Sequence, residues 1–458
     1  MTRLLTKIVS PIIQIVKGVL TLKHGWQSLC YYIYNMETKE DIEKNTPLAN
    51  IATLGDFNKN RGKKRFLIGA LIVLFAIFTY FVLSQNKKTK NLENINRTII
   101  TPVITRSISQ RANTIKRETI GFLPSWSVAQ KAKVYPKDLT QIIYFGLNVN
   151  KDGSIIKYDE NNLPVLEWSY FNSPYFNEIR KEASGSGTKV LLSIKSFDNT
   201  TIDNIISNQI ATNKLTGQLS ALIKQYSLDG INIDFEYFTD INFPTSEYLA
   251  KFLEELSASL KKDNPRIIIS IDVNATVVVK DKAYNMTKIS KAVDQVILMA
   301  YDYRGQNSTR AGPTSPIYGE INEHSIWESV GSLSGRVPDN KLILAIPFYG
   351  YEWQTFTEKH KSSTIEGSGA LATYKRIKKL LKERSDIVKS WDDISKSPWL
   401  SYMQYGGIYQ IYYEDDRSIA EKIKFSKEKK MGGIAIWALG YEGNYTEPWK
   451  VIEKENKN

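Results

Sequence analysis

The stretch LDGINIDFEYF (residues 228–238) combines an apolar and a polar pattern in one short segment. Isoleucine and phenylalanine take alternate positions, as in a buried β-strand, and Asn232, Asp234 and Glu236 take the positions between them. Because successive side chains of a strand point to opposite faces, the three polar side chains share one face, about 6–7 Å apart. Two carboxylates that close repel, so we expect one of them to hold a proton near neutral pH. The alternative is a half-exposed strand with a solvated polar face.

Similar short, β-branched apolar segments recur from residue 117 onward, with helical patterns between several of them. Eight near-continuous apolar strands that alternate with helices predict a parallel sheet closed into a (β/α)8 TIM barrel, an α/β fold. The long interval at about 351–431 predicts a small α+β insertion between the seventh and eighth strands. The eight segments are 119–123, 141–147, 189–194, 230–236, 266–273, 295–301, 341–350 and 432–439.

The predicted barrel changes the interpretation of the polar row. One face of each strand points into the packed interior, where polar and charged groups are costly unless they are paired. Catalytic groups of such barrels lie at the C-terminal ends of the strands, and Glu236 ends the fourth. A functional site is therefore favoured over a solvated strand face.

The N-terminal quarter predicts a membrane anchor. Residues 66–84 (FLIGALIVLFAIFTYFVLS) are uncharged, and as a helix they span about 28 Å, close to the thickness of a bilayer core. We expect a single transmembrane helix there. Residues 1–65 would form a cytoplasmic segment with an amphipathic helix, suited to a membrane surface or to a partner protein. Residues 85–116 would form a juxtamembrane linker, and residues 117–458 an extracytoplasmic catalytic domain.

Composition and motifs exclude several other classes. The net charge is +13, but the lysines and arginines are scattered, so a solvated basic surface is favoured and no nucleic-acid partner is expected. The single cysteine excludes an intramolecular disulfide, and only three histidines argue against a His-rich metal site. Phosphate-binding, dinucleotide-binding and serine-nucleophile motifs are missing from the sequence, and no cofactor is expected.

Four motifs resemble those of glycoside hydrolase family 18, the chitinase-like family, and they occur in the family's order. DGINIDFE resembles the family signature DGxDxDxE, and LMAYDY resembles the sixth-strand motif MxYD. The ending IWALGYEG resembles the endings found in the bacterial branch of the family, which includes spore-germination hydrolases and chitobiase-like enzymes. The resemblance covers about 117–450, with the motifs at 229–236, 298–303, 346–353 and 432–443.

The resemblance implies retaining hydrolysis of a β-1,4 bond beside an N-acetylhexosamine, with the substrate's own acetamido group as nucleophile. Glu236 would be the general acid and base, and Asp234 would orient the acetamido group and stabilise its developing charge. Tyr301 would donate a hydrogen bond to the acetamido oxygen, and Asp302 would shape the same pocket. Trp437 would form the apolar floor under the distorted sugar.

The resemblance also implies further substrate contacts, and the sequence departs from the family pattern at two places. Met299 and Tyr349 are expected to contact substrate, and so is Asn232, which stands where many members have an aspartate. Asn232 would hydrogen-bond Asp234 without supplying charge, so we expect Asp234 to ionise more easily than beside a second carboxylate. Lys195 and Ser196 stand where many members have glycines. They would narrow the substrate groove on the side of the third strand or change its charge.

Three classes of function are compatible with these observations. A membrane-anchored hydrolase of N-acetylglucosamine-containing glycans, chitin-type or peptidoglycan, is favoured over a non-hydrolytic chitinase-like lectin because Glu236 is present. An anchored structural protein is the third class. Three tryptophans are candidates for additional sugar-stacking surfaces, with a structural role as the alternative: Trp126, Trp353 and Trp399.

Overall fold

The computed structural model describes residues 117–237, 244–280 and 283–457, and all structural statements below concern these ranges. The predicted cytoplasmic segment, transmembrane helix and linker (1–65, 66–84 and 85–116) lie outside them. Within the described ranges, no helix combines the length and apolar character that crossing a bilayer requires.

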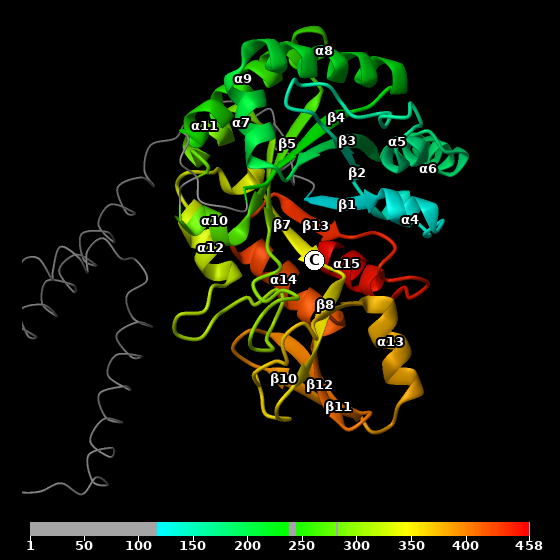
Figure 1. Cartoon of the computed structure of the whole chain (residues 1–458), viewed down its shortest axis with the longest axis vertical. Helices are drawn as coiled ribbons and strands as arrows, with labels where there is room; N and C mark the ends of the chain where they lie inside the picture. Colours follow the sequence, from blue (N-terminus) through cyan, green and yellow to red (C-terminus); the bar gives the residue numbers. More distant parts are fainter. Residues whose placement is uncertain (1–116, 238–243, 281–282, 458) are drawn as a thin grey trace, which may run out of the picture. The chain divides into compact units, whose positions relative to one another are not determined.

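Eight parallel strands form a closed barrel, as the sequence predicts (Figure 1). The strands follow one another around the barrel in the order β1, β2, β3, β4, β5, β6, β7 and β13, and β13 closes on β1. Their bounds are β1 (Glu118–Pro124), β2 (Gln141–Asn148), β3 (Lys189–Ser196), β4 (Gly230–Phe235), β5 (Ile268–Asn274), β6 (Gln295–Met299), β7 (Leu342–Pro347) and β13 (Gly433–Trp437).

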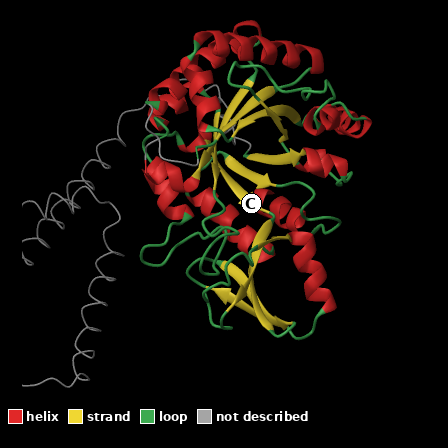
Figure 2. Ribbon diagram, viewed as in Figure 1, coloured by secondary structure: helices red, strands yellow, loops and turns green. Residues whose placement is uncertain are grey.

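Helices surround the strands of the barrel (Figure 2). Most connect one barrel strand to the next, which is the βαβ arrangement that makes neighbouring strands parallel. They are α4 (Ser125–Ala129), α5 (Leu166–Phe171), α6 (Pro174–Ser186), α7 (Asn199–Ser207), α8 (Gln209–Tyr226), α9 (Thr245–Asp263), α10 (Ala275–Lys280), α11 (Met286–Ala292), α12 (Ile326–Leu333), α14 (Asp416–Glu428) and α15 (Glu447–Lys457), with short 3₁₀ turns at Pro136–Asp138 and Asp339–Lys341.

Strand β4 shows how the alternating sequence places apolar side chains between the barrel and its helices and polar side chains inside the barrel. Its apolar side chains are fully buried among the residues that pack the helices onto the barrel, and the Phe235 ring stacks 5.8 Å from that of Phe252 on α9. The alternate residues, Asn232 and Asp234, are also buried, but they point into the barrel. The polar row is therefore an interior feature and not a solvated face.

The first two residues of the DGINIDFE motif hold β4 between its neighbours. The Asp229 carboxylate accepts hydrogen bonds from the Val190 amide (2.9 Å) and the Lys189 ammonium (3.2 Å). A Cβ atom at Gly230 would lie 2.2 Å from the Ile268 carbonyl oxygen, so only glycine permits this approach of β4 to β5. Asp229 and Gly230 therefore position the strand that carries the polar row.

A second, smaller sheet lies between β7 and β13 in the sequence and below the barrel in Figure 1. It is antiparallel, in the order β10, β11, β12, β8 and β9, with one helix, α13 (Tyr374–Glu383). The seventh barrel strand ends at Pro347, and Tyr349 already belongs to this sheet. The strands are β8 (Tyr349–Thr355), β9 (Ala370–Thr373), β10 (Val388–Asp392), β11 (Ser397–Gln404) and β12 (Gly407–Tyr412).

The chain returns from the small sheet to the barrel through helix α14, which packs against β7 and β13. Its N-terminus has a capping box between Asp415 and Ser418, which pairs the first free amides of the helix. The Lys422 ammonium, on the same helix, forms a fully buried ion pair with Glu414 (2.7 Å). The segment expected at 351–431 thus divides into the small sheet and α14.

Candidate active site

Glu236 follows directly after β4 at the C-terminal end of the barrel. Its backbone amide donates to the Ser196 carbonyl oxygen of β3 (3.0 Å), which fixes the chain where the strand ends. Burial and the negative charge of Asp302 raise the pKa of the Glu236 carboxyl to about 7, although a hydrogen bond from the Asn274 side chain opposes the shift. A carboxyl group with this pKa can both give and take a proton near neutral pH.

Asp234 lies on the same inward row, one strand repeat before Glu236, and only 2% of its surface is exposed. Burial raises the pKa of the Asp234 carboxyl well above its ordinary value, and the charges of Glu236 and Asp272 add to the shift. Its Oδ1 atom is buried and has no hydrogen-bond partner among the described residues. Asp234 therefore presents an unused acceptor beside Glu236.

Asn232 is paired with the next strand rather than with Asp234. Its amide nitrogen donates to the Asp272 carboxylate (2.8 Å) and to the Ser270 hydroxyl (3.1 Å), both on β5. The prediction that Asn232 bonds to Asp234 is therefore wrong. The comparison of Asn232 with an aspartate at the same position stays a prediction, but burial, Glu236 and Asp272 together raise the pKa of Asp234.

Tyr301 and Asp302 come after β6 and bring two more polar groups to the site. Asp302 has a left-handed backbone (φ +58°), a conformation that aspartate tolerates better than most residues. Its carboxylate accepts from the Tyr349 hydroxyl (2.5 Å), and burial raises its pKa despite hydrogen bonds from Tyr349 and Tyr351. Burial and the charges of the surrounding carboxylates raise the pKa of Tyr301, so this phenol remains a hydrogen-bond donor. Met299 is buried at the end of β6.

Trp437 ends β13 and lies among aromatic rings. Its ring centroid is 4.6 Å from that of Phe145 on β2, 5.7 Å from Phe122 on β1 and 6.5 Å from Tyr301. The Trp126 ring is 39% exposed and lies edge-on to the Trp437 ring, with the two centroids 6.3 Å apart. Trp437 thus contacts the apolar rings of β1 and β2 and also the Tyr301 ring that follows β6.

Two of the three candidate tryptophans pack in the small sheet, as the structural alternative predicts. Trp353 is fully buried and donates to the Gln306 carbonyl oxygen (3.1 Å). Trp399 is 9% exposed and stacks on Tyr412 at 5.7 Å. Both belong to a buried cluster against which Tyr301 and Trp437 pack, and these contacts favour the structural role for both rings.

Three residues near the carboxyl groups were not predicted from the sequence: Asp272, Asn274 and Tyr284. Asp272 and Asn274 share the inward row of β5 with Ser270, so a polar alternation within RIIISIDVN was the available signal. Tyr284 is buried beyond β5, and burial with the charges of Glu236 and Asp234 raises its pKa. No local pattern marks Tyr284, because a loop brings it to the site.

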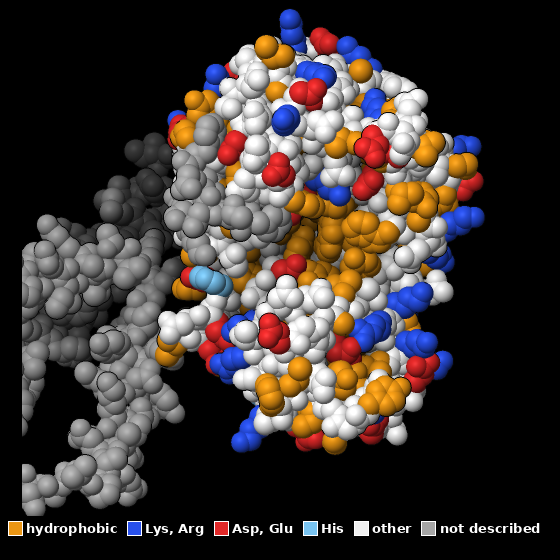
Figure 3. Space-filling view, viewed as in Figure 1, with side chains coloured by type: hydrophobic (Ala, Val, Ile, Leu, Met, Phe, Trp, Pro, Cys, Tyr) orange, Lys and Arg blue, Asp and Glu red, His pale blue; other side chains and the backbone are white. Residues whose placement is uncertain are grey.

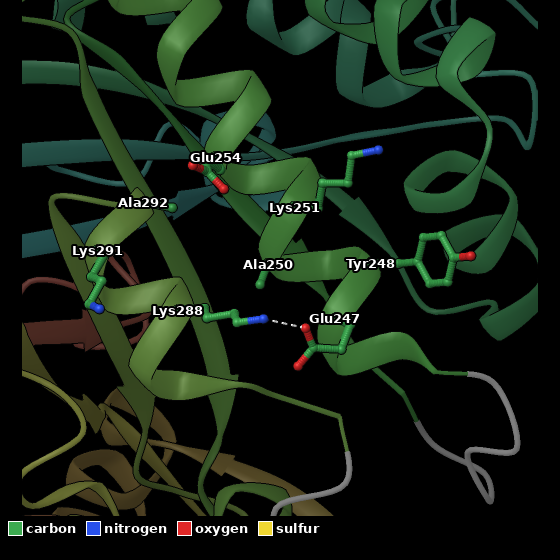
Figure 4. A pocket seen from close by; sticks show the side chains of 8 residues that line it. All are labelled: Glu247, Tyr248, Ala250, Lys251, Glu254, Lys288, Lys291 and Ala292. Carbon is green, nitrogen blue, oxygen red and sulfur yellow. Dashed lines mark hydrogen bonds and ion pairs between the residues drawn. The ribbon is translucent and has the colours of Figure 1, made fainter.

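A depression on the outer surface, between α9 and α11, is a different feature (Figure 4). Its rim carries the exposed ion pair of Glu247 and Lys288, and Tyr248 points away from the other lining residues. Hydrogen bonds from Lys288 and Asn285 lower the pKa of the Glu247 carboxyl, so this exposed group stays ionised and is not poised to give a proton near neutral pH. Figure 3, by contrast, shows a hollow lined by hydrophobic side chains over the region where Figure 1 draws β1 and β13.

Neighbouring buried carboxyl groups at the C-terminal end of a parallel barrel, beside a cluster of aromatic rings, are typical of barrel glycosidases. Within that class the chain belongs to glycosyl hydrolases family 18, whose family model matches residues 118–442.

Two relatives and two solved structures illustrate the similarity. The chain is 26% identical over 254 residues to probable chitinase 2 of Drosophila melanogaster, covering 51% of this chain and 52% of that protein. It is 27% identical over 281 residues to the uncharacterized glycosylase YvbX of Bacillus subtilis, covering 58% and 72%. The chain thus spans about half the length of the first relative.

The two structures support the fold. The group IV chitinase of Ostrinia furnacalis, solved with allosamidin, has a TM-score of 0.65 at 18% identity, covering 74% of this chain and 98% of that one. The spore cortex-lytic enzyme SleL of Bacillus cereus has a TM-score of 0.58 at 19% identity, covering 74% of each chain.

Proposed function

We propose that the chain hydrolyses β-1,4 bonds next to N-acetylhexosamine in chitin-type oligosaccharides or peptidoglycan, with retention of configuration and with help from the substrate's acetamido group. The observation that carries the proposal is Glu236, a carboxyl with a pKa of about 7 beside the buried Asp234. The chitinase, glycosylase and cortex-lytic names of similar proteins support this substrate class.

In the first step, protonated Glu236 gives its proton to the leaving oxygen while the acetamido carbonyl oxygen attacks the anomeric carbon. The Oδ1 atom of Asp234, unpaired among the described residues, accepts from the acetamido N–H and stabilises the positive charge of the cyclised sugar. Tyr301 donates to the acetamido oxygen, and Trp437 supports the apolar face of the ring. In the second step, ionised Glu236 takes a proton from the water that opens the intermediate, which restores the acid.

The test is to incubate the full chain with chitooligosaccharides and with purified peptidoglycan, and to identify the products by mass. Cleavage should require an acetylated sugar on the non-reducing side of the scissile bond, because its acetamido oxygen is the nucleophile. A thiazoline mimic of the cyclised sugar should bind more tightly than product. If deacetylated oligosaccharides are cut as fast as acetylated ones, the assisted mechanism is wrong and Asp302 becomes the candidate nucleophile.

We also propose that residues 66–84 anchor the enzyme to the cell membrane by a single span, with the catalytic domain outside the cytoplasm. The uncharged length of this segment and the extracytoplasmic location of peptidoglycan support the proposal. Protease added to intact cells or spheroplasts should remove the barrel. Protection of the barrel until the cells are lysed would contradict this topology.

A further inference from the structure

Lys195 occupies a position on the inner wall of the barrel where an ammonium group is unexpected. The inward row of β3 consists of Leu191, Ser193 and Lys195, and Leu191 packs among the apolar residues of the barrel interior. In register, Lys195 lies opposite Asp234 on β4. The lysine side chain therefore belongs to the C-terminal mouth of the barrel, on the strand next to the one that carries the carboxyl groups.

Aromatic rings, rather than carboxylates, surround the Lys195 ammonium. It lies 5.1 Å from the ring centroid of Phe145 and 5.5 Å from that of Phe197. It forms no ion pair with any residue that the structure describes. Its charge lowers the pKa of Asp234, but only against larger effects of burial and of two carboxylates. The ammonium is thus held in place by cation–π contacts and keeps its hydrogen-bond donors for another partner.

The surroundings of Lys195 suit a sugar that carries a negative charge. Phe145 contacts Trp437 at 4.6 Å, so the ammonium is one ring away from the proposed sugar floor. Phe197 (45% exposed) and Trp126 (39% exposed) offer apolar surface at the same mouth. A neutral N-acetylglucosamine polymer gives an ammonium only hydroxyl and carbonyl acceptors. A carboxylate gives it a charge-assisted hydrogen bond, which is about twice as strong.

We propose that Lys195 forms a subsite for a carboxylate substituent on the glycan, and that the enzyme prefers carboxylate-bearing amino-sugar polymers of the peptidoglycan type to neutral, chitin-type polymers. This inference rests on the proposed function, because it names the substrate class of the same site. It gives Lys195 a role in specificity rather than in proton transfer.

Two soluble chitin ethers of similar bulk test the charge: carboxymethyl chitin, which is anionic, and glycol chitin, which is neutral. Dissociation constants are measured in the full chain carrying Glu236→Gln, so that turnover does not interfere. The anionic polymer should bind more tightly, and adding Lys195→Met should reduce the ratio of the two affinities about tenfold. Lys195→Arg should restore most of the ratio, and added salt should reduce it only when position 195 is cationic.

A second pair of ligands identifies the source of the carboxylate. Peptide-free glycan strands of peptidoglycan, which carry lactyl carboxylates, are compared with the same strands after methyl esterification. A preference for the free acids that Lys195→Met removes would assign the subsite to the lactyl group. A preference confined to carboxymethyl chitin would overturn the assignment to peptidoglycan-type polymers, because the carboxylate would then be recognised at another sugar position. Lys251→Met, on the outer helix α9, is the matched control and should leave both ratios unchanged.

The proposal is overturned if Lys195→Met leaves the ratios unchanged, or if it weakens anionic and neutral ligands equally, as a residue that only positions Asp234 would. The binding ratios do not depend on turnover. Failure of the wild-type chain to cleave any of the four polymers would therefore count against the proposed hydrolase function, while the ratios would still decide the role of Lys195.

Discussion

The two sides of the barrel mouth differ in chemistry although they are built from the same kind of strand. Strands β4, β5 and β6, with the residues just after them, carry buried carboxyl, amide and phenol groups; we call these the acidic half. Strands β13, β1 and β2 carry Trp437, Phe122 and Phe145; we call these, with Trp126, the aromatic half. Lys195 on β3 separates the two halves between β2 and β4.

The difference indicates a division of tasks between charge and contact area. In the acidic half, burial and neighbouring charges shift the pKa values of Glu236, Asp234 and Asp272 in the same direction, upward. Because the charges of these groups act on one another, removal of one charge changes the protonation of the others. We expect the rings of the aromatic half to act mainly on affinity. Substitutions in the acidic half should therefore alter rate and pH dependence, and those in the aromatic half should alter binding.

The largest effect is expected at the proton donor. Glu236→Gln removes the acid with little change in volume, so turnover should fall by about 10²–10⁴-fold while glycan binding is retained. Single-turnover rates and dissociation constants measure the two separately. Glu254→Gln, on the outer helix α9, is the matched control. Full turnover in Glu236→Gln would mean that another group supplies the proton.

The second-largest effect is expected at Trp437, the ring of the aromatic half that is proposed to lie under the sugar. Trp437→Ala removes the ring that Phe122 and Phe145 support, and should weaken glycan binding by about 2 kcal/mol, or roughly 30-fold. We expect most of this loss in KM. Trp327→Ala, at a 55% exposed tryptophan on α12, controls for a general effect of losing an indole. A loss confined to kcat would contradict the expectation that the aromatic half acts on binding and the acidic half on rate.

Charge within the acidic half should control the alkaline limit of activity. The negative charge of Asp302 stabilises protonated Glu236, so Asp302→Asn should lower the pKa of Glu236 from its value of about 7. Because the proton donor must be protonated, the alkaline limb of kcat/KM against pH should move to lower pH by about one unit. Asp393→Asn, in an exposed turn, should leave the limb in place. A shift to higher pH would show that the sign of the interaction is wrong.

The smallest effect should occur at the edge of the aromatic half. Trp126 is partly exposed and contacts Trp437 only edge-on, so Trp126→Ala should raise KM about threefold on long glycans, and less on disaccharides. A comparison of KM values across chain lengths measures this. Tyr405→Ala, at an exposed tyrosine of the small sheet, serves as the control. An equal loss at all lengths would place Trp126 in the central subsite.

The sequence predicts the barrel well because its strands are local patterns. Each strand is a short apolar segment, and eight of them leave few other arrangements. The polar row of β4 is predicted for the same reason, since alternation by itself decides which side chains share a face. Glu236, Asp234, Tyr301, Asp302 and Trp437 are brought to one end of the barrel, and their catalytic roles remain predictions.

Contacts between side chains of different strands are harder to predict from one sequence. Whether Asn232 meets Asp234 or Asp272 depends on the register of β4 against β5, where Asn232 lies opposite Ser270. That register is set by the closure of the whole barrel. Trp353 and Trp399 are similar cases, because their burial depends on how the strands of the small sheet pack against one another.

The pairing of β1 with β13 also has a consequence for synthesis and folding. The Arg117 guanidinium donates to the Met431 carbonyl oxygen (2.6 Å), 314 positions later in the chain. A ribosome-bound chain therefore cannot close the barrel until β13 has been made, and contacts of such long range form slowly. Trp437 joins Phe122 and Phe145 only at this last step. Nascent chains that already carry the carboxyl groups of the acidic half would consequently lack the ring proposed to support the sugar, and the edges of β1 and β7 would still be unpaired.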